Sequence, residues 1–296
     1  MKNPVMTASG TFGCGREYAS FFDLGRLGAL VVKSLTLKER MGNVPPRICE
    51  TPSGILNSVG LQNKGVEGFI KEDLPFLKEF NVPIIANVAG ESIDEYVQVC
   101  GRLEAEKDIA AIELNISCPN VKNGGMLFGQ DPEMASLVVG ECRKAVSKPL
   151  IVKLTPNVTD ISQIARRMED AGADAVSLIN TLLGMAIDTK SFQPLLAGTT
   201  GGLSGPAIKP VAVRMVWEVA KAVSVPVIGM GGITKAEDAL EFFLAGANAV
   251  AIGTANLMEP TSAVKIIQGL ETFMEQKGFQ SIKDIIGKVK LVPKNR

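Results

Sequence analysis

Short apolar runs alternate with longer amphipathic stretches along the whole chain, and this alternation limits the possible folds more than any other feature. Eight runs have the length of strands and are rich in β-branched residues: Pro4–Ala8, Ala29–Ser34, Val82–Val88, Ala110–Ile116, Pro149–Thr155, Ala173–Asn180, Val225–Gly229 and Ala247–Gly253. Nearly continuous apolar runs are typical of parallel strands that are covered on both faces.

Helical patterns separate these runs, among them Pro132–Ser147, Ile161–Ala171, Ala207–Val223 and Lys235–Ala245. Eight strand–helix units predict a (β/α)₈ TIM barrel, formed as a single domain by residues 1–296. The alternative is a doubly wound open sheet, but such a sheet normally has only about six strands. Two connections are long, Leu35 to Lys64 and Leu182 to Pro206, and we expect both to be functional.

The charge balance excludes several kinds of partner. Lys plus Arg and Asp plus Glu both total 31, so no excess charge attracts nucleic acid or an anionic membrane. No apolar run approaches the roughly 18 residues of a membrane span, and no secretory signal opens the chain. We therefore expect a cytoplasmic protein whose ligand is a small molecule.

The chain has no histidine, which excludes His-based triads and the commonest general base. Its five cysteines are scattered and include no CxxC pair, so we expect no disulfide framework, zinc site or iron–sulfur cluster in this chain. Acid–base chemistry must therefore use Cys, Lys, Tyr or a carboxylate.

Polar residues follow six of the predicted strands, at the end where TIM barrels carry their active sites. These strand ends carry Ser9, Lys33 with Ser34, Asn87, Asn115, Lys153, and Asn180 with Thr181. Each alone could simply begin a loop, but six together predict a binding site. Lysine is rarely buried without a partner, so we expect Lys33 and Lys153 to face a bound anion or an electron-rich ring.

The last two predicted strands are followed by glycines that are suited to binding phosphate. Gly231 and Gly232 follow the seventh strand, and Gly253 and Thr254 follow the eighth. Glycine lets the backbone approach a ligand closely, and the helix that follows offers free N–H groups. Since TIM barrels commonly bind phosphate at this place, we predict a phosphorylated cofactor or substrate.

Cys118 lies in the segment Ser117-Cys118-Pro119-Asn120, just after the fourth strand, and is the strongest candidate for a general base. An inert buried thiol is the alternative, because most free cysteines are of that kind. The strand-end position, the following proline and the glycine-rich segment after it favour a reactive role. We expect the other four cysteines, Cys14, Cys49, Cys100 and Cys142, to be packing residues, Cys14 being the least clear.

Several motifs resemble those of the class 1 dihydroorotate dehydrogenases, and more closely the class 1B catalytic subunit, over essentially the whole chain. They include Ala8-Ser9-Gly10, Lys33-Ser34, Asn57-Ser58-Val59-Gly60-Leu61-Gln62-Asn63, Asn115-Ile116-Ser117-Cys118-Pro119-Asn120, Lys153-Leu154-Thr155-Pro156-Asn157, Asn180-Thr181 and Gly201-Gly202-Leu203-Ser204-Gly205. The sequence departs from the family at Lys64, where Pro is common, and lacks the family's residues before the first strand. We expect these departures to affect loop stiffness and closure of the barrel bottom, not the chemistry.

The resemblance implies an FMN site and a pyrimidine site. The FMN ring and ribityl chain would contact Ser9, Lys33, Ser34, Asn87, Asn115, Lys153, Ile179 and Gly205, and the FMN phosphate would contact Gly231, Gly232, Gly253 and Thr254. Dihydroorotate would be held by Lys33, Asn57, Ser58, Val59, Gly60, Leu61, Asn115, Asn120, Asn180 and Thr181. Asn side chains suit a pyrimidine edge because they both donate and accept hydrogen bonds.

The resemblance also implies a mechanism and a partner. Cys118, as a thiolate, would remove a proton from C5 of dihydroorotate while a hydride leaves C6 for FMN, and Lys153 would stabilise the negative charge that develops on the flavin. Class 1B relatives are expected to be homodimers that bind a second subunit, carrying FAD and a [2Fe–2S] cluster, as a heterotetramer that reduces NAD⁺. Two alternatives remain: a class 1A-like enzyme that reduces fumarate, and a flavin-free phosphate-binding isomerase or lyase that uses Lys153 or Lys33.

Overall fold

A computed structural model describes residues 1–116 and 128–291 of the chain. Its central sheet has eight parallel strands: β1 (Val5–Thr7), β2 (Leu30–Val31), β5 (Ile84–Val88), β6 (Ile109–Asn115), β7 (Leu150–Lys153), β8 (Ala175–Leu178), β13 (Val227–Met230) and β14 (Ala249–Ile252). From β5 onward each strand pairs with its predecessor in this series, and β14 also pairs with β1. A parallel bridge between Met6 and Ala29 joins β1 to β2, so the sheet closes. The predicted TIM barrel is confirmed, and the open-sheet alternative is wrong.

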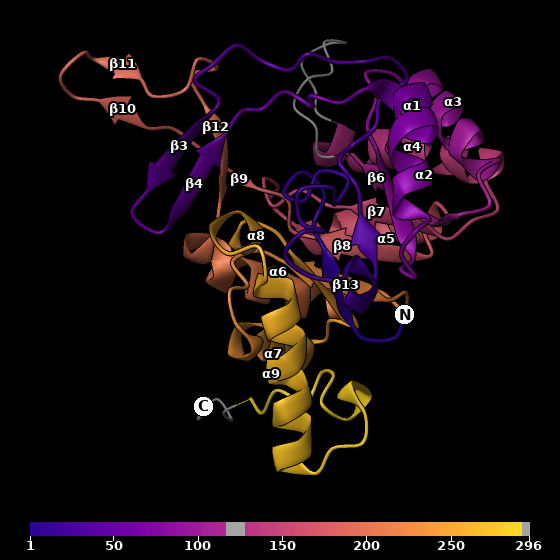
Figure 1. The fold of residues 1–296 in the computed structure, drawn as a ribbon, viewed down its shortest axis with the longest axis vertical. Helices are drawn as coiled ribbons and strands as arrows, with labels where there is room; N and C mark the ends of the chain where they lie inside the picture. The colour runs from indigo at the N-terminus through magenta and orange to yellow at the C-terminus, as the bar shows by residue number, and fades with distance from the viewer. Residues whose placement is uncertain (117–127, 292–296) are drawn as a thin grey trace.

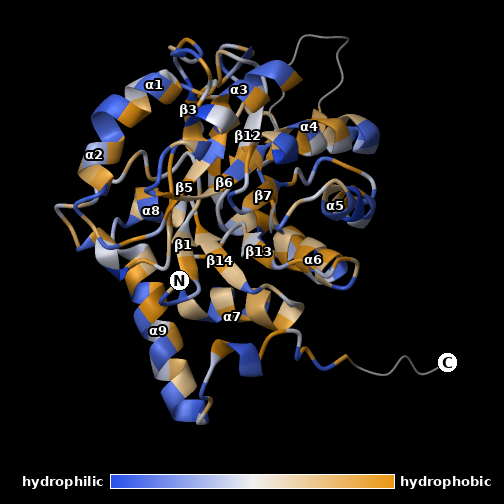
Figure 2. Ribbon diagram, turned by 90° about the vertical axis from the view of Figure 1, so that its right-hand side faces the viewer, coloured by the Kyte–Doolittle hydropathy of each residue, from blue (hydrophilic) through white to orange (hydrophobic). Residues whose placement is uncertain are grey.

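Helices surround the barrel (Figures 1 and 2). They are α1 (Gly65–Gly68) and α2 (Leu74–Leu77) after β2, α3 (Ile93–Glu104), α4 (Pro132–Ala145), α5 (Ile161–Asp170), α6 (Lys209–Ala220) and α7 (Ala236–Ala245) after the next five strands, and α8 (Ala255–Met258) and α9 (Ser262–Lys277) after β14. Asp131 and Asp160 cap α4 and α5, because their side chains accept backbone N–H groups at the starts of these helices. Within the described residues, no helix is both long and apolar enough to cross a membrane.

Most predicted strand and helix boundaries are off by one to three residues at an end. One difference affects the site: β13 continues to Met230, because Gly229 and Met230 pair with Leu178 on β8 and Ala251 on β14. The loop after the seventh strand therefore begins at Gly231, one residue later than the predicted strand end implies.

The two long connections form a second sheet, which the sequence did not predict. Its antiparallel order is β3 (Ile48–Thr51), β4 (Gly54–Asn57), β12 (Gly201–Ser204) and β9 (Leu182–Gly184). Because β4 pairs with β12, residues from both long connections lie together beside the mouth of the barrel. The hairpin of β10 (Ile187–Asp188) and β11 (Gln193–Pro194) projects farther from the barrel, at the upper left of Figure 1.

Apolar side chains from all eight strands line the interior of the barrel, and on β5 to β8 polar side chains follow them toward the strand ends. Side chains such as Met6, Ala8, Met230 and Ala251, from β1, β13, β14 and their ends, form an apolar cluster inside the barrel. On β5 to β8 the first side chains that point into the barrel are apolar: Ile85, Ala111, Ile151 and Ala175. Because alternate residues of a strand share a face, the polar residues that follow them also point into the barrel: Asn87, Glu113, Asn115, Lys153 and Ser177. All five of these polar side chains are buried. Burial of so many polar groups is costly unless they bind each other or a ligand.

Candidate active site

A cavity of about 490 Å³ lies at the carboxyl ends of the barrel strands, beside the second sheet. The predicted site residues that line it are Ser9, Lys33, Ser34, Asn57, Ser58, Val59, Gly60, Leu61, Asn115, Lys153, Ile179, Asn180, Thr181, Gly205, Gly231, Gly232, Gly253 and Thr254. They come from strand ends and both long connections, so the fold brings distant motifs together. Cys118 and Asn120 lie outside the described residues.

Asn87 is the exception among the described site residues. It is 0% exposed and does not line the cavity. Its Nδ2 donates to Oε2 of Glu113 at 2.6 Å, while its Oδ1 is buried with no hydrogen-bond partner among the described residues. An unsatisfied buried acceptor is costly, so this oxygen is suited to a donor that the protein itself does not supply.

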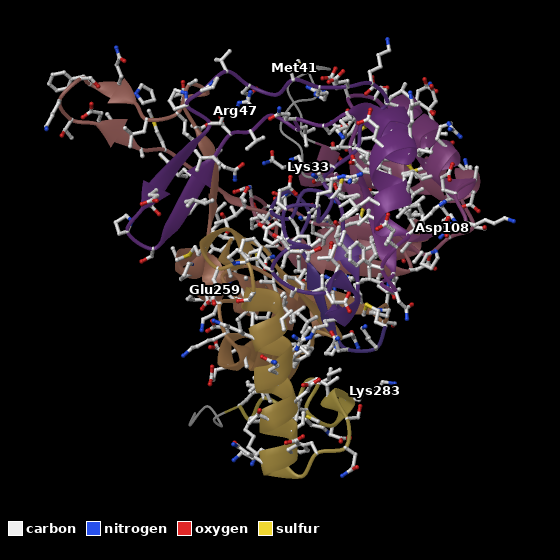
Figure 3. The ribbon with its side chains drawn as sticks, viewed as in Figure 1. Lys33, Met41, Arg47, Asp108, Glu259 and Lys283 are labelled. Atoms are coloured by element: carbon white, nitrogen blue, oxygen red, sulfur yellow. The ribbon has the colours of Figure 1, made fainter. Side chains whose placement is uncertain are left out.

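Lys153 and Lys33 bring two cationic side chains to the cavity. Lys153 is 4% exposed, and its Nζ donates to Oγ of Ser9 at 3.1 Å. Burial lowers the pKa of Lys153, and the negative charge of Glu113 opposes that shift. Figure 3 shows Lys33 in the middle of the molecule, with Arg47 and Met41 on the long connection above it. Both lysines therefore suit an electron-rich or anionic ligand.

Amide side chains from several elements line one part of the cavity. Nδ2 of Asn180 donates to Oδ1 of Asn115 at 3.3 Å, and Nδ2 of Asn57 donates to the carbonyl of Gly202 at 3.3 Å. The hydroxyl oxygen of Ser58, which follows Asn57, is buried and has no hydrogen-bond partner in the part of the chain that the structure describes. This arrangement offers both donors and acceptors, as recognition of a ring with alternating polar groups requires.

The glycine loops after β13 and β14 line another part of the cavity. Gly231 and Gly232 have φ values of +128° and +73°, which favour glycine. The backbone N–H groups of Gly231, Gly232, Gly253 and Thr254 donate no hydrogen bond to any residue that the structure describes. Such a cluster of available N–H groups is suited to a phosphate.

Asp238 in α7 holds one of these loops in place. Its carboxylate accepts hydrogen bonds from the backbone N–H and the hydroxyl of Thr234 at 2.9 and 2.7 Å, and from Nζ of Lys209 at 2.6 Å. Burial alone would raise the pKa of Asp238, but Lys209 and the Thr234 donors outweigh burial and lower it. Asp238 is therefore a charged anchor between α6 and α7.

Comparison with known proteins identifies the family. The sequence model of the dihydroorotate dehydrogenases matches residues 1–274. The chain belongs to the dihydroorotate dehydrogenase family. It is 58% identical over 287 residues to a Pelobacter propionicus protein named dihydroorotate dehydrogenase B (NAD(+)), catalytic subunit, covering 97% of this chain and 94% of the relative. Proteins of the same name from Trichlorobacter lovleyi, with the same coverage, and Alkaliphilus oremlandii, covering 98% of this chain and 95% of the relative, are each 57% identical.

The cavity also contains residues that sequence reasoning did not assign to the site. Asn157 lines it and links two elements, because its Nδ2 donates to the carbonyl of Thr181 and its Oδ1 accepts the N–H of Leu183. Asn43, Thr155 and Gln130 line it too. Asn157 and Thr155 belong to the motif that begins at Lys153, so the motif was a usable signal for both.

Two of the four cysteines that were predicted to be packing residues are fully buried. Cys100 on α3 and Cys142 on α4 are each 0% exposed, and the hydrogen bond to Cys142, together with burial, raises the pKa of Cys100 well above its ordinary value. Cys14 and Cys49 are only partly buried. Burial and the nearby Asp73 raise the pKa of Cys14 to about 12, so it is a poor source of thiolate.

Proposed function

We propose that this protein oxidises dihydroorotate to orotate in pyrimidine biosynthesis, with FMN as its bound cofactor. The observation that carries the proposal is the full-length relationship to catalytic subunits named dihydroorotate dehydrogenase B. Support comes from the cavity, whose walls contain every described site residue that the family resemblance implies except Asn87.

The cavity fits FMN by the chemistry of its lining residues. The unpartnered N–H groups at Gly231, Gly232, Gly253 and Thr254 would hold the phosphate. Lys33 and Lys153 would contact the ring, and the unpartnered Oδ1 of Asn87 offers an acceptor beneath the cavity. When bound, FMN supplies the hydride acceptor. Lys153, as an ammonium ion, would stabilise negative charge on the ring.

The substrate would lie among the amide groups of Asn57, Asn115 and Asn180. A site built from such groups rejects rings that cannot pair with them, because its own donors and acceptors would then be left unsatisfied. Cys118 is our proposed base, since it follows β6 directly in a chain without histidine. Its thiolate would take the proton from C5 of the substrate.

We propose that electrons pass to NAD⁺ through a second subunit with FAD and a [2Fe–2S] cluster, in a heterotetramer built on a homodimer of this chain. The relatives are named as NAD⁺-linked catalytic subunits. A surface for association is available around the projecting hairpin, where Leu183, Ile187 and Phe192 are 67%, 55% and 85% exposed. Exposed apolar side chains in one region are typical of interaction surfaces.

The deciding experiment is flavin extraction followed by stopped-flow reduction with dihydroorotate. We expect the purified protein to release FMN and the bound flavin to bleach when dihydroorotate is added. A protein that has no flavin absorbance and cannot be loaded with FMN would support the isomerase or lyase alternative instead. Turnover with fumarate, in the absence of any partner, would favour the class 1A-like alternative.

A further inference from the structure

Glu113 is a buried carboxylate that the chemistry proposed so far does not use. It lies on β6, two residues before Asn115, and is 3% exposed. A carboxylate buried inside a barrel is costly unless donors and an opposite charge surround it. Its position below the cavity therefore requires an explanation.

Both oxygens of Glu113 accept short hydrogen bonds, one from the adjacent strand β5 and one from β8, which lies beyond β7. Nδ2 of Asn87 on β5 donates to Oε2 at 2.6 Å, and Oγ of Ser177 on β8 donates to Oε1 at 2.7 Å. Asn87 and Ser177 are each 0% exposed. Since one donor faces each oxygen, the arrangement suits the ionised carboxylate, which only accepts hydrogen bonds.

Lys153 is the last residue of β7, a strand that lies between the two strands that carry these donors. Its register partners are Asn115 on β6 and Ser177 on β8, so it stands within the group that surrounds Glu113. Ser9 after β1 accepts a hydrogen bond from its Nζ, Asn115 and Ser177 flank it in register, and Glu113, which Asn87 on β5 binds, acts on its charge. Lys33 after β2 lines the same cavity. Among these groups, Glu113 carries the negative charge.

We propose that Glu113 is a positioning residue that acts through Lys153 and Asn87. Its carboxylate is the counter-ion that keeps the buried Lys153 protonated, and its Oε2 fixes the orientation of the Asn87 amide by accepting from Nδ2. The Glu113 charge opposes the effect of burial on the pKa of Lys153, as this assignment requires. The link to FMN rests on the proposed function, whereas the pairing of Glu113 with Lys153 does not.

The first test uses unfolding of the flavin-free protein, so its result is independent of FMN binding. Lys153→Met leaves the Glu113 carboxylate buried without its counter-ion, and we expect a marked fall in the unfolding midpoint. Adding Glu113→Gln to that variant should raise the midpoint again. A double variant that is less stable than Lys153→Met would overturn the pairing, and this comparison holds even if Glu113→Gln alone does not fold.

The second test follows FMN affinity against pH, by quenching of flavin fluorescence. Because Lys153 binds its proton below its pKa, FMN affinity should fall as pH rises through that pKa. Glu113→Gln should move this fall to lower pH by about one to two pH units, and Glu113→Asp should move it less because the charge is retained. The fall should vanish in the Glu113→Gln/Lys153→Met variant.

The matched control is Glu67→Gln, which removes an exposed carboxylate paired with Arg102 on the outside of the barrel. It should keep the wild-type pH profile. The proposed action through Lys153 would be overturned if FMN affinity depended on pH in Glu113→Gln as it does in wild type. It would also be overturned if the fall in FMN affinity at high pH persisted in the variant that lacks Lys153. If the wild-type protein binds no FMN, the proposed function fails while the unfolding test still decides the pairing.

Discussion

Gly232→Ala tests whether the loop after β13 must approach its neighbours as closely as the structure shows. Gly232 has φ of +73°, and an added Cβ would lie 2.8 Å from Cβ of Lys209 and 2.9 Å from the carbonyl oxygen of Gly205. The left-handed backbone costs an L-residue roughly 1 to 2 kcal/mol. Overpacking against an immovable backbone costs roughly 1 to 3 kcal/mol more.

The two costs add up to about 2 to 5 kcal/mol. If all of this cost weakened binding, FMN affinity would fall by roughly 30- to 3000-fold, and this is the largest loss we expect. Part of the cost will appear as lower stability, because α6 begins at Lys209 and packs against the same loop. We therefore expect both a lower unfolding temperature and weaker FMN binding, measured by thermal unfolding of the flavin-free protein and by fluorescence titration.

Gly278→Ala is the matched control. Gly278 has φ of +71°, almost the same as Gly232, but an added Cβ would have no atom within 4 Å. It ends α9, away from the cavity. The control should lose a little stability and keep wild-type FMN affinity. If Gly232→Ala binds FMN as tightly as Gly278→Ala does, the close approach of this loop is not needed for the cofactor and our reasoning about the phosphate site is refuted.

Three further predictions concern the base, the substrate site and the anchor of α7. Cys118→Ala should still bind FMN, while reduction of the bound flavin by dihydroorotate slows by on the order of 10²-fold or more. Unchanged reduction kinetics in this variant would exclude Cys118 as the base. So would a wild-type reduction rate that does not rise with pH as the thiol ionises. Truncating Asn57 or Asn180 to Ala should weaken orotate binding more than FMN binding in parallel titrations, and equal losses would contradict the substrate assignment. Asp238→Ala should cost about 2 kcal/mol or more of unfolding free energy at neutral pH, since several hydrogen bonds to a charge are lost. The folded-state pKa of Asp238 is lowered, so the ionised carboxylate stabilises the fold above its unfolded-state pKa, and this stabilisation is lost as pH falls through its folded-state pKa. The difference in urea midpoint between Asp238→Ala and wild type should therefore shrink below about pH 4. A difference that persists in acid would mean that the charge of Asp238 does not stabilise the fold.

The barrel and most of the site could be predicted because the signals are local. Each strand is a continuous apolar run, and each polar residue that follows it lies at the same end of the barrel. Lys33, Lys153 and Asn180 come from different strands, yet a parallel barrel brings all strand ends to one mouth. Strand assignment alone was therefore enough to group them around one cavity.

The second sheet could not be predicted in the same way. Its strands are short and β12 begins Gly201-Gly202, a composition that suggests a turn rather than a strand. The pairing of β12 with β4 joins residues about 145 positions apart, as in the bond from Asn57 to Gly202. No local pattern reports such a partner. The sequence therefore indicated that both long connections matter without indicating that they form one wall of the cavity.

Glu113 shows the other limit of the sequence. A lone carboxylate within the apolar run of β6 could have faced solvent, and alternation along one strand cannot say what lies opposite. Only closure of the barrel brings Asn87, Glu113 and Ser177 onto one polar side of the interior. That side lies beneath Lys153, so the charge on the cavity floor depends on a residue that does not itself line the cavity. Substitutions at Glu113 should for this reason alter the behaviour of Lys153 even though they change no wall of the cavity.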